Sequence, residues 1–191
     1  TLVKIRRDEQ LASAKILGVK DVRFLPFEDG GMYDEVALRI EIAKVIAEIK
    51  PDVVIGPDHK LYPESHPDHL RVGEAVSKAY FMCGNVNMMK SVGVTQIAKP
   101  TVLAYYFTGK PNRFVKITKK DFEKTKAAYA CFVSQCPPPD NGKSLMLYMR
   151  LKVRLNGLRS FHIRADAFRV MNNMHIHCCG EAEDTAIRRP L

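Results

Sequence analysis

The stretch 52–69, DVVIGPDHKLYPESHPDH, decides how the chain is expected to fold. It begins with an apolar run, residues 53–55, that has the composition of a buried strand. It ends with a polar segment, residues 64–69, that contains two histidines and an aspartate. Pro67 suits the first turn of a helix, where its missing N–H would have no partner in any case. The stretch therefore predicts a strand, a polar loop and a helix, and the carboxyl end of such a strand is where open α/β sheets bind ligands.

The patterns around this stretch alternate between helix and strand. Apolar residues at helical spacing predict helices over residues 5–19, 34–50 and 67–82, and short apolar runs predict strands over residues 21–26 and 53–55. This alternation is typical of an α/β fold, with a parallel sheet and helices on both faces. Such a pattern begins with a strand, whereas here a helix comes first, so we expect a first strand to be missing from this sequence.

Weaker patterns continue through the second half of the chain. Thr118, followed three residues later by Asp121, resembles a capping box and predicts that a helix begins there. The other expected elements are strands over residues 101–107, 113–117 and 161–170 and a helix over residues 144–155.

Length and composition predict one globular domain spanning residues 1–191, because 46% of the residues are hydrophobic and 27% are charged. No apolar run is long enough to span a bilayer. The five cysteines form no C-x-x-C pair, which argues against a disulfide framework and for a reducing, cytoplasmic location. Cys178 and Cys179 lie near His175 and His177, a cluster that we interpret as incidental because it lacks a second pair of metal ligands.

The positive charge of the chain is unevenly distributed. The net charge is +9, and residues 143–170 contain seven Lys or Arg residues against the single acid Asp166. A nucleic-acid surface is one interpretation. We favour a solvated face or a subunit contact, because no aromatic residues for base stacking are interleaved with these charges.

The chemistry of the central segment depends on His66, Asp68 and His69. Imidazoles three residues apart face the same way in a first helical turn, so one can bind a metal while the other reaches the same substrate atom. A carboxylate between them can hold an imidazole in one tautomer. The alternative is a surface loop rich in residues that cap helices, and short metal-like motifs have many false positives.

Residues 53–76, with His66-Pro67-Asp68-His69 inside them, resemble the second signature of the LmbE/PIG-L family of zinc-dependent N-acetylglucosaminyl deacetylases. Further similar stretches occur in the same order at residues 6–18, 25–30, 114–135 and 165–169. The resemblance covers nearly the whole chain. It implies an LmbE-like, Rossmann-like three-layer fold with a mainly parallel sheet.

The resemblance also implies roles for five residues. It makes His69 a zinc ligand and His66 the group that stabilises or protonates the tetrahedral intermediate, with Asp68 steering His66. Arg6 and Asp29 match positions that hold the sugar. Without the resemblance, we would interpret Arg6 as an exposed arginine at a helix start and Asp29 as a turn residue. The implied reaction is hydrolysis of the acetamide of an N-acetylated amino sugar by metal-activated water, which releases acetate.

One departure from the family pattern concerns the metal. The family's first signature, His-Pro-Asp-Asp-Glu, supplies two of the three protein ligands and the general base, and this sequence contains no second His-Pro-Asp. His59 is a poor substitute, and a catalytic zinc requires three protein ligands and one open position. We expect the missing signature to lie upstream of Thr1.

Two alternatives remain open at this stage. The first is a non-catalytic sugar-binding homologue that lacks the first metal signature. The second is an α/β domain that binds nucleotides or nucleic acids through the basic segment, which no glycine-rich phosphate loop supports. For the enzyme we expect an amino-sugar substrate, zinc, no membrane partner and a homo-oligomer.

Overall fold

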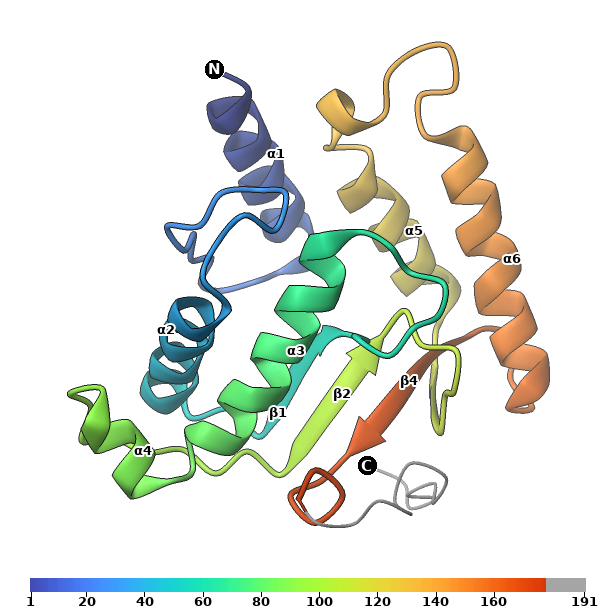
Figure 1. Ribbon diagram of the computed structural model, residues 1–191. Helices are drawn as coiled ribbons and strands as arrows, with labels where there is room; N and C mark the ends of the chain where they lie inside the picture. Colours follow the sequence, from blue (N-terminus) through green and yellow to red (C-terminus); the bar gives the residue numbers. More distant parts are fainter. Residues whose placement is uncertain (178–191) are drawn as a thin grey trace. The chain divides into compact units, whose positions relative to one another are not determined.

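The computed structural model describes residues 1–177, and within them the chain forms two compact units (Figure 1). The first unit comprises Thr1–Phe24 and Phe114–Asp166, and the second comprises Leu25–Arg113 and the segment from Ala167 onward. The elements in chain order are α1 (Leu2–Leu17), α2 (Glu35–Ile49), β1 (Val53–Pro57), α3 (Pro67–Met82), α4 (Val86–Ser91), β2 (Val102–Tyr106), β3 (Arg113–Lys116), α5 (Lys119–Tyr129), the 3-10 helix η1 (Val133–Gln135), α6 (Lys143–Arg159) and β4 (Ala165–Met171). The prediction of one domain across residues 1–191 stays a prediction.

In the first unit, α1 packs against α5. α1 ends at Gly18, whose φ of 81° is the left-handed conformation that glycine adopts without strain. Lys124 on α5 donates a hydrogen bond of 2.9 Å to the Leu17 carbonyl at this end of α1. The expected capping box is confirmed, because Thr118 Oγ1 accepts from the Asp121 N–H while the Asp121 carboxylate accepts from the Thr118 N–H.

The sheet has the strand order β1-β2-β4-β3. β1 and β2 are parallel, with Val54 opposite Leu103, whereas β4 runs antiparallel to β2, with Val170 opposite Ala104. The predicted α/β fold is therefore confirmed, and its sheet contains an antiparallel pair beside the parallel one. The strand at the β1 edge leads directly into the polar segment of interest.

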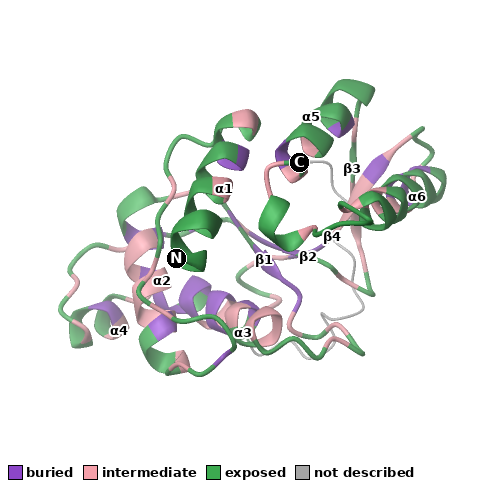
Figure 2. Ribbon diagram, turned by 90° about the horizontal axis from the view of Figure 1, so that it is seen from above, coloured by how far each residue is buried: buried purple, intermediate pink, exposed green. Residues whose placement is uncertain are grey.

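The core of the second unit lies between the sheet and the pair α2 and α3 (Figure 2). Ala43 and Ala47 on α2 and Ala79 on α3 are fully buried, which allows the helices to approach closely. Gly73 on α3 lies so close to β1 that an added Cβ would be 2.4 Å from the Pro57 carbonyl oxygen. Contacts of this kind fix the position of α3 relative to the end of β1.

The helix predicted over residues 34–50 is confirmed as α2. The Asp34 side chain caps it by accepting from the N–H groups of Val36 and Ala37 at 2.7 and 3.0 Å. Lys50 ends the helix in the left-handed conformation, and Pro51 follows. The strand and helix predicted at residues 53–55 and 67–82 are confirmed as β1 and α3.

One predicted strand is wrong. Residues 21–26 form no strand in the structure, because none of the described strands supplies the ladder of hydrogen bonds that a strand needs. Between α3 and β2 the chain forms the short helix α4, Val86–Ser91. Cys178 and Cys179 lie outside the described residues. Over residues 1–177, no helix combines the length and apolar character needed to cross a membrane.

Candidate functional site

The candidate site lies where β1 leads into α3. The chain leaves the sheet after Pro57, forms a loop and enters α3 with His66 as the N-cap and Pro67 as the first helical residue. His66 has extended backbone angles and no side-chain cap hydrogen bond, so its imidazole remains available for other partners. This places both histidines of the central segment at the N-terminal end of α3, where the unpaired N–H groups of a first turn favour negative charge.

Glu64 orients His69. Its Oε2 lies 2.8 Å from His69 Nδ1, and its Oε1 accepts from the N–H groups of Ser65 and His66 at 2.9 and 2.8 Å. The pKa of Glu64 is lowered to about 2, most by its hydrogen bond with the His69 side chain and next by the hydrogen bond from the His66 N–H. An ionised carboxylate at Nδ1 holds the proton of a neutral imidazole on that nitrogen and leaves the lone pair on Nε2.

The two imidazoles lie together. The His66 and His69 rings are stacked, with centroids 4.7 Å apart and an interplanar angle of 25°. The Phe107 ring, which follows β2, lies 6.0 Å from His69 and forms an apolar neighbour. The side chains of His66 and His69 are 51% and 42% exposed, so a ligand can reach both rings.

Asp68 binds the loop before α2 as well as lying near His66. Its Oδ2 accepts from the Gly30 N–H at 2.8 Å and lies 3.8 Å from His66 Nδ1. Burial opposes ionisation of Asp68, but the hydrogen bonds from the Gly30 N–H and the Tyr33 hydroxyl help to outweigh it, and the pKa of this carboxyl group is lowered overall. The predicted steering of His66 by Asp68 stays a prediction, since 3.8 Å is longer than a hydrogen bond.

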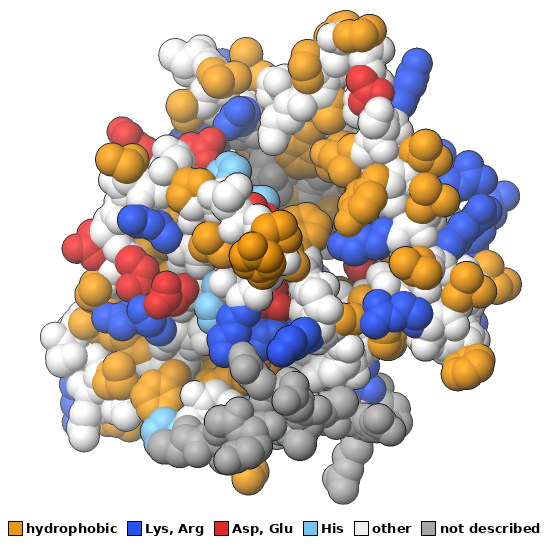
Figure 3. All heavy atoms as spheres, turned by 45° about the vertical axis from the view of Figure 1, so that its right-hand side comes forward, with side chains coloured by type: hydrophobic (Ala, Val, Ile, Leu, Met, Phe, Trp, Pro, Cys, Tyr) orange, Lys and Arg blue, Asp and Glu red, His pale blue; other side chains and the backbone are white. Residues whose placement is uncertain are grey.

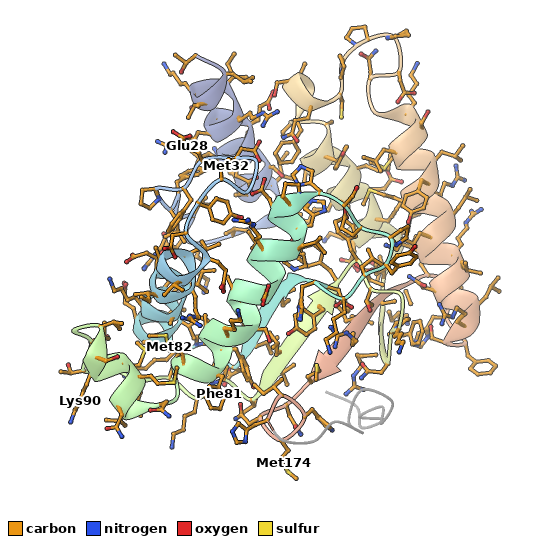
Figure 4. The ribbon with its side chains drawn as sticks, in the orientation of Figure 1. Glu28, Met32, Phe81, Met82, Lys90 and Met174 are labelled. Atoms are coloured by element: carbon orange, nitrogen blue, oxygen red, sulfur yellow. The ribbon has the colours of Figure 1, made fainter. Side chains whose placement is uncertain are left out.

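The loop that carries Asp29 is fastened to the start of α3. Gly31 has a φ of 72°, and a Cβ there would lie 2.7 Å from Pro67 Cβ, so only glycine fits. Arg71 on α3 donates to the Tyr33 carbonyl at 3.1 Å. Figure 4 shows this loop, marked by its residues Glu28 and Met32, beside the end of α3 that is opposite Phe81 and Met82. The structure thereby brings Asp29 next to Asp68, which is 39 residues later in the sequence.

A buried ion pair lies beyond the end of β1. Asp58 accepts from Arg169 Nε at 2.9 Å and from its Nη2, and the two side chains are 3% and 6% exposed. Burial raises the pKa of Asp58, but the hydrogen bonds from Arg169 and Thr108 outweigh it, and the pKa is lowered overall. The neighbouring His59 packs edge-on against Tyr105 at 5.5 Å.

Only part of a metal site is found among the described residues. No group of three or more His, Cys, Asp or Glu side chains there is placed to hold a metal ion. His69 Nδ1 faces the Glu64 carboxylate, and in the tautomer with the proton on Nδ1 the lone pair is on Nε2. The described residues therefore do not form a complete catalytic zinc site.

Four of the five predicted site residues, Asp29, His66, Asp68 and His69, come together in the second unit. Arg6 lies on α1 in the first unit, and its role in sugar binding stays a prediction. Glu64 was not among the residues predicted from the sequence to act in the site. Its place directly before the two histidines was the available signal, but the turn that brings it to His69 depends on the hydrogen bond from its N–H to the Leu61 carbonyl at 3.0 Å.

Comparison with known proteins finds similarity to one family model and to several deacetylases. The model of the PIG-L family, described as GlcNAc-PI de-N-acetylase, matches residues 1–80. Diacetylchitobiose deacetylase from Thermococcus kodakarensis is 32% identical over 176 residues, which cover 91% of this chain and 65% of that protein. Residues 1–80 are thus similar to the PIG-L family, and nearly the whole chain is similar to one deacetylase.

Further proteins named as deacetylases resemble the chain in sequence or structure. The structure of N,N'-diacetylchitobiose deacetylase from Pyrococcus horikoshii superimposes with a TM-score of 0.82 at 28% identity, covering 94% of this chain and 67% of that one. A probable N-acetyl-alpha-D-glucosaminyl L-malate deacetylase 2 from Bacillus anthracis is 37% identical over 83 residues, which cover 41% of this chain and 35% of that protein. The chain thus spans about two thirds of the length of the Thermococcus relative and about one third of the Bacillus one.

Proposed function

We propose that the protein is an N-deacetylase that hydrolyses the acetamide of an N-acetylglucosamine-type amino sugar, releasing acetate and a free amine. The observation that carries this proposal is the pair of accessible imidazoles at the start of α3, one of them oriented by Glu64, in a chain whose residues 1–80 match the PIG-L family model. The names of the relatives support the substrate class, since all three described above are deacetylases of acetylated amino sugars.

Each residue of the site has a physical role in this proposal. Glu64 holds His69 in the tautomer that presents Nε2. His66, exposed beside it and next to the N–H groups of the first turn of α3, donates a hydrogen bond or a proton to the oxyanion that forms when water adds to the acetyl carbon. Asp68 holds the loop that carries Asp29, which places a carboxylate for the sugar hydroxyl groups. Arg6 is proposed as a second sugar-binding group.

A zinc ion is the proposed cofactor, with His69 as one ligand. When bound, zinc lowers the pKa of its water and polarises the acetyl carbonyl. Two further protein ligands would be needed, and the described residues do not supply them. The expectation that a strand and a His-Pro-Asp-Asp-Glu signature lie upstream of Thr1 remains a proposal, and the coding sequence upstream of Thr1 tests it. A cytoplasmic homo-oligomer likewise remains a proposal.

The incomplete ligand set favours one competing function, a sugar-binding homologue without catalysis. Incubating the purified protein with N,N'-diacetylchitobiose and zinc, and measuring free amine and acetate, separates the two. We expect equal amounts of both products from the wild type and none from His69→Ala. The matched control is His162→Ala, an exposed histidine of the other unit, which should keep full activity. Sugar binding without product, or equal turnover by His69→Ala, would reject the deacetylase assignment.

A further inference from the structure

α6 has an apolar face that no described part of the chain covers. Tyr148, Leu151, Leu155 and Leu158 are 56%, 57%, 58% and 76% exposed. The opposite side of the helix packs inward through Val153, Asn156 and Gly157, which are buried. Figure 2 accordingly colours most of α6 as exposed or half-buried. Leucines exposed to this degree on one side of a helix indicate a surface that binds another molecule.

The spacing of these four residues is that of a coiled-coil seam. They recur at intervals of three, four and three residues, which are the a and d positions of a heptad. At 3.6 residues per turn they fall within an arc of about 80°. Leu147, at the g position before Tyr148, is also 58% exposed and widens the stripe at that end to about 100°. From Tyr148 onward the stripe keeps the a and d spacing of a contact between two helices. The geometry therefore favours a helix as the partner.

The charges beside the seam determine which helix fits. Lys152 and Arg159 occupy e positions on one side of it, Arg154 occupies a g position on the other, and α6 contains no acidic residue. Figure 3 shows basic and hydrophobic side chains interspersed over the part of the surface where α6 lies. Two copies of α6 facing each other would oppose cation to cation, so pairing with itself is disfavoured. Glutamates at the facing positions of a partner would complement all three cations.

We propose that the outer face of α6 docks an acidic amphipathic helix of a partner protein. The a and d residues of that helix pack on the four residues of the seam, and its e and g glutamates pair with Lys152, Arg154 and Arg159. The contact uses only α6 and is separate from the deacetylase site on α3.

The test is a calorimetric titration of the purified protein with a synthetic helix of about four heptads, with Ile at a, Leu at d and Glu at e and g. We expect saturable binding that weakens as the salt concentration rises. Leu151→Ser combined with Leu155→Ser should weaken binding by about tenfold or more. The matched control, Leu11→Ser combined with Leu17→Ser, changes two leucines of α1 that are 47% and 46% exposed and should not alter binding.

Reversing the charges beside the seam distinguishes specific helix pairing from non-specific hydrophobic binding. The variant with both Lys152→Glu and Arg154→Glu should no longer bind the glutamate peptide. It should instead bind a peptide that has the same a and d residues but Lys at e and g. Equal binding of both peptides by the wild type would overturn the proposal. So would self-association in sedimentation experiments that is abolished by the Leu151 and Leu155 substitutions. A third contrary result would be binding of phosphatidylglycerol vesicles through these leucines without binding of the glutamate peptide. Circular dichroism confirms that each variant remains folded, and deacetylase activity should be unchanged in all of them.

Discussion

Replacing Gly73 by alanine should destabilise the protein, although the same change within a helix ordinarily stabilises it. A Cβ at Gly73 would lie 2.4 Å from the Pro57 carbonyl oxygen and 3.0 Å from the His59 nitrogen. Both are backbone atoms, so no side-chain rotation relieves the contact. α3 must move away from the end of β1, and the histidines at its N-terminal end must move with it.

The size of the effect follows from two opposing contributions. Alanine gains about 1 kcal/mol over glycine in a helix interior. Restoring an ordinary contact distance requires a shift of about 1 Å, and overpacking of this kind costs about 1–3 kcal/mol. Because the obstacle is backbone, we take the upper value and expect a net loss of about 2 kcal/mol. A displacement of about 1 Å at His66 and His69 should also reduce turnover by about 100-fold.

Urea unfolding of Gly73→Ala measures the loss, with Gly84→Ala as the matched control. The nearest atom to a Cβ at Gly84 is 3.4 Å away, so that variant should stay within about 0.5 kcal/mol of the wild type. A Gly73→Ala protein as stable as the wild type, or more stable, would refute the argument that close backbone contact fixes α3 against β1.

Three further predictions follow from single contacts. Glu64→Gln removes the carboxylate that orients His69 and should lower zinc affinity and turnover by about 10–100-fold without altering the urea midpoint, as measured by metal analysis and product release. Asp58→Asn leaves Arg169 buried against a neutral group and should cost about 3–5 kcal/mol in urea unfolding. Folding lowers the pKa of Asp58, so the ionised Asp58 carboxylate contributes fully to stability above about pH 4, and this contribution is lost as the pH falls below that value. The free energy of unfolding of the wild type should therefore decrease more than that of Asp58→Asn as the pH is lowered below about 4. Thr118→Ala removes the capping box of α5 and should cost about 1 kcal/mol, seen as a lower melting temperature.

The elements that the sequence predicted correctly carry their own local signals. α2 has an aspartate cap, regular apolar spacing and a following proline, and α5 has its capping box. Residues 21–26 have strand-like composition but form no strand, because a strand exists only through hydrogen bonds to a neighbour that its own sequence does not encode. Local patterns therefore predicted helices better than they predicted the extent of the sheet.

In the candidate site, too, local sequence signals were found and long-range contacts were missed. His66, Asp68 and His69 were found because they are adjacent in sequence, and the resemblance to the family supplied Asp29. The role of Glu64 was missed, because it depends on how the loop turns between Leu61 and His66. The ion pair of Asp58 with Arg169 joins residues 111 positions apart, a separation at which spacing in one sequence gives no signal.

The central claim is that His69, oriented by Glu64, binds a divalent metal ion at the start of α3. The most direct measurement is anomalous diffraction at the zinc absorption edge from crystals of the protein purified from its own cells. We expect a single strong anomalous peak about 2.1 Å from His69 Nε2, with Nδ1 still bonded to Glu64. A His69 ring turned away from Glu64, with no anomalous density near its Nε2, would contradict it.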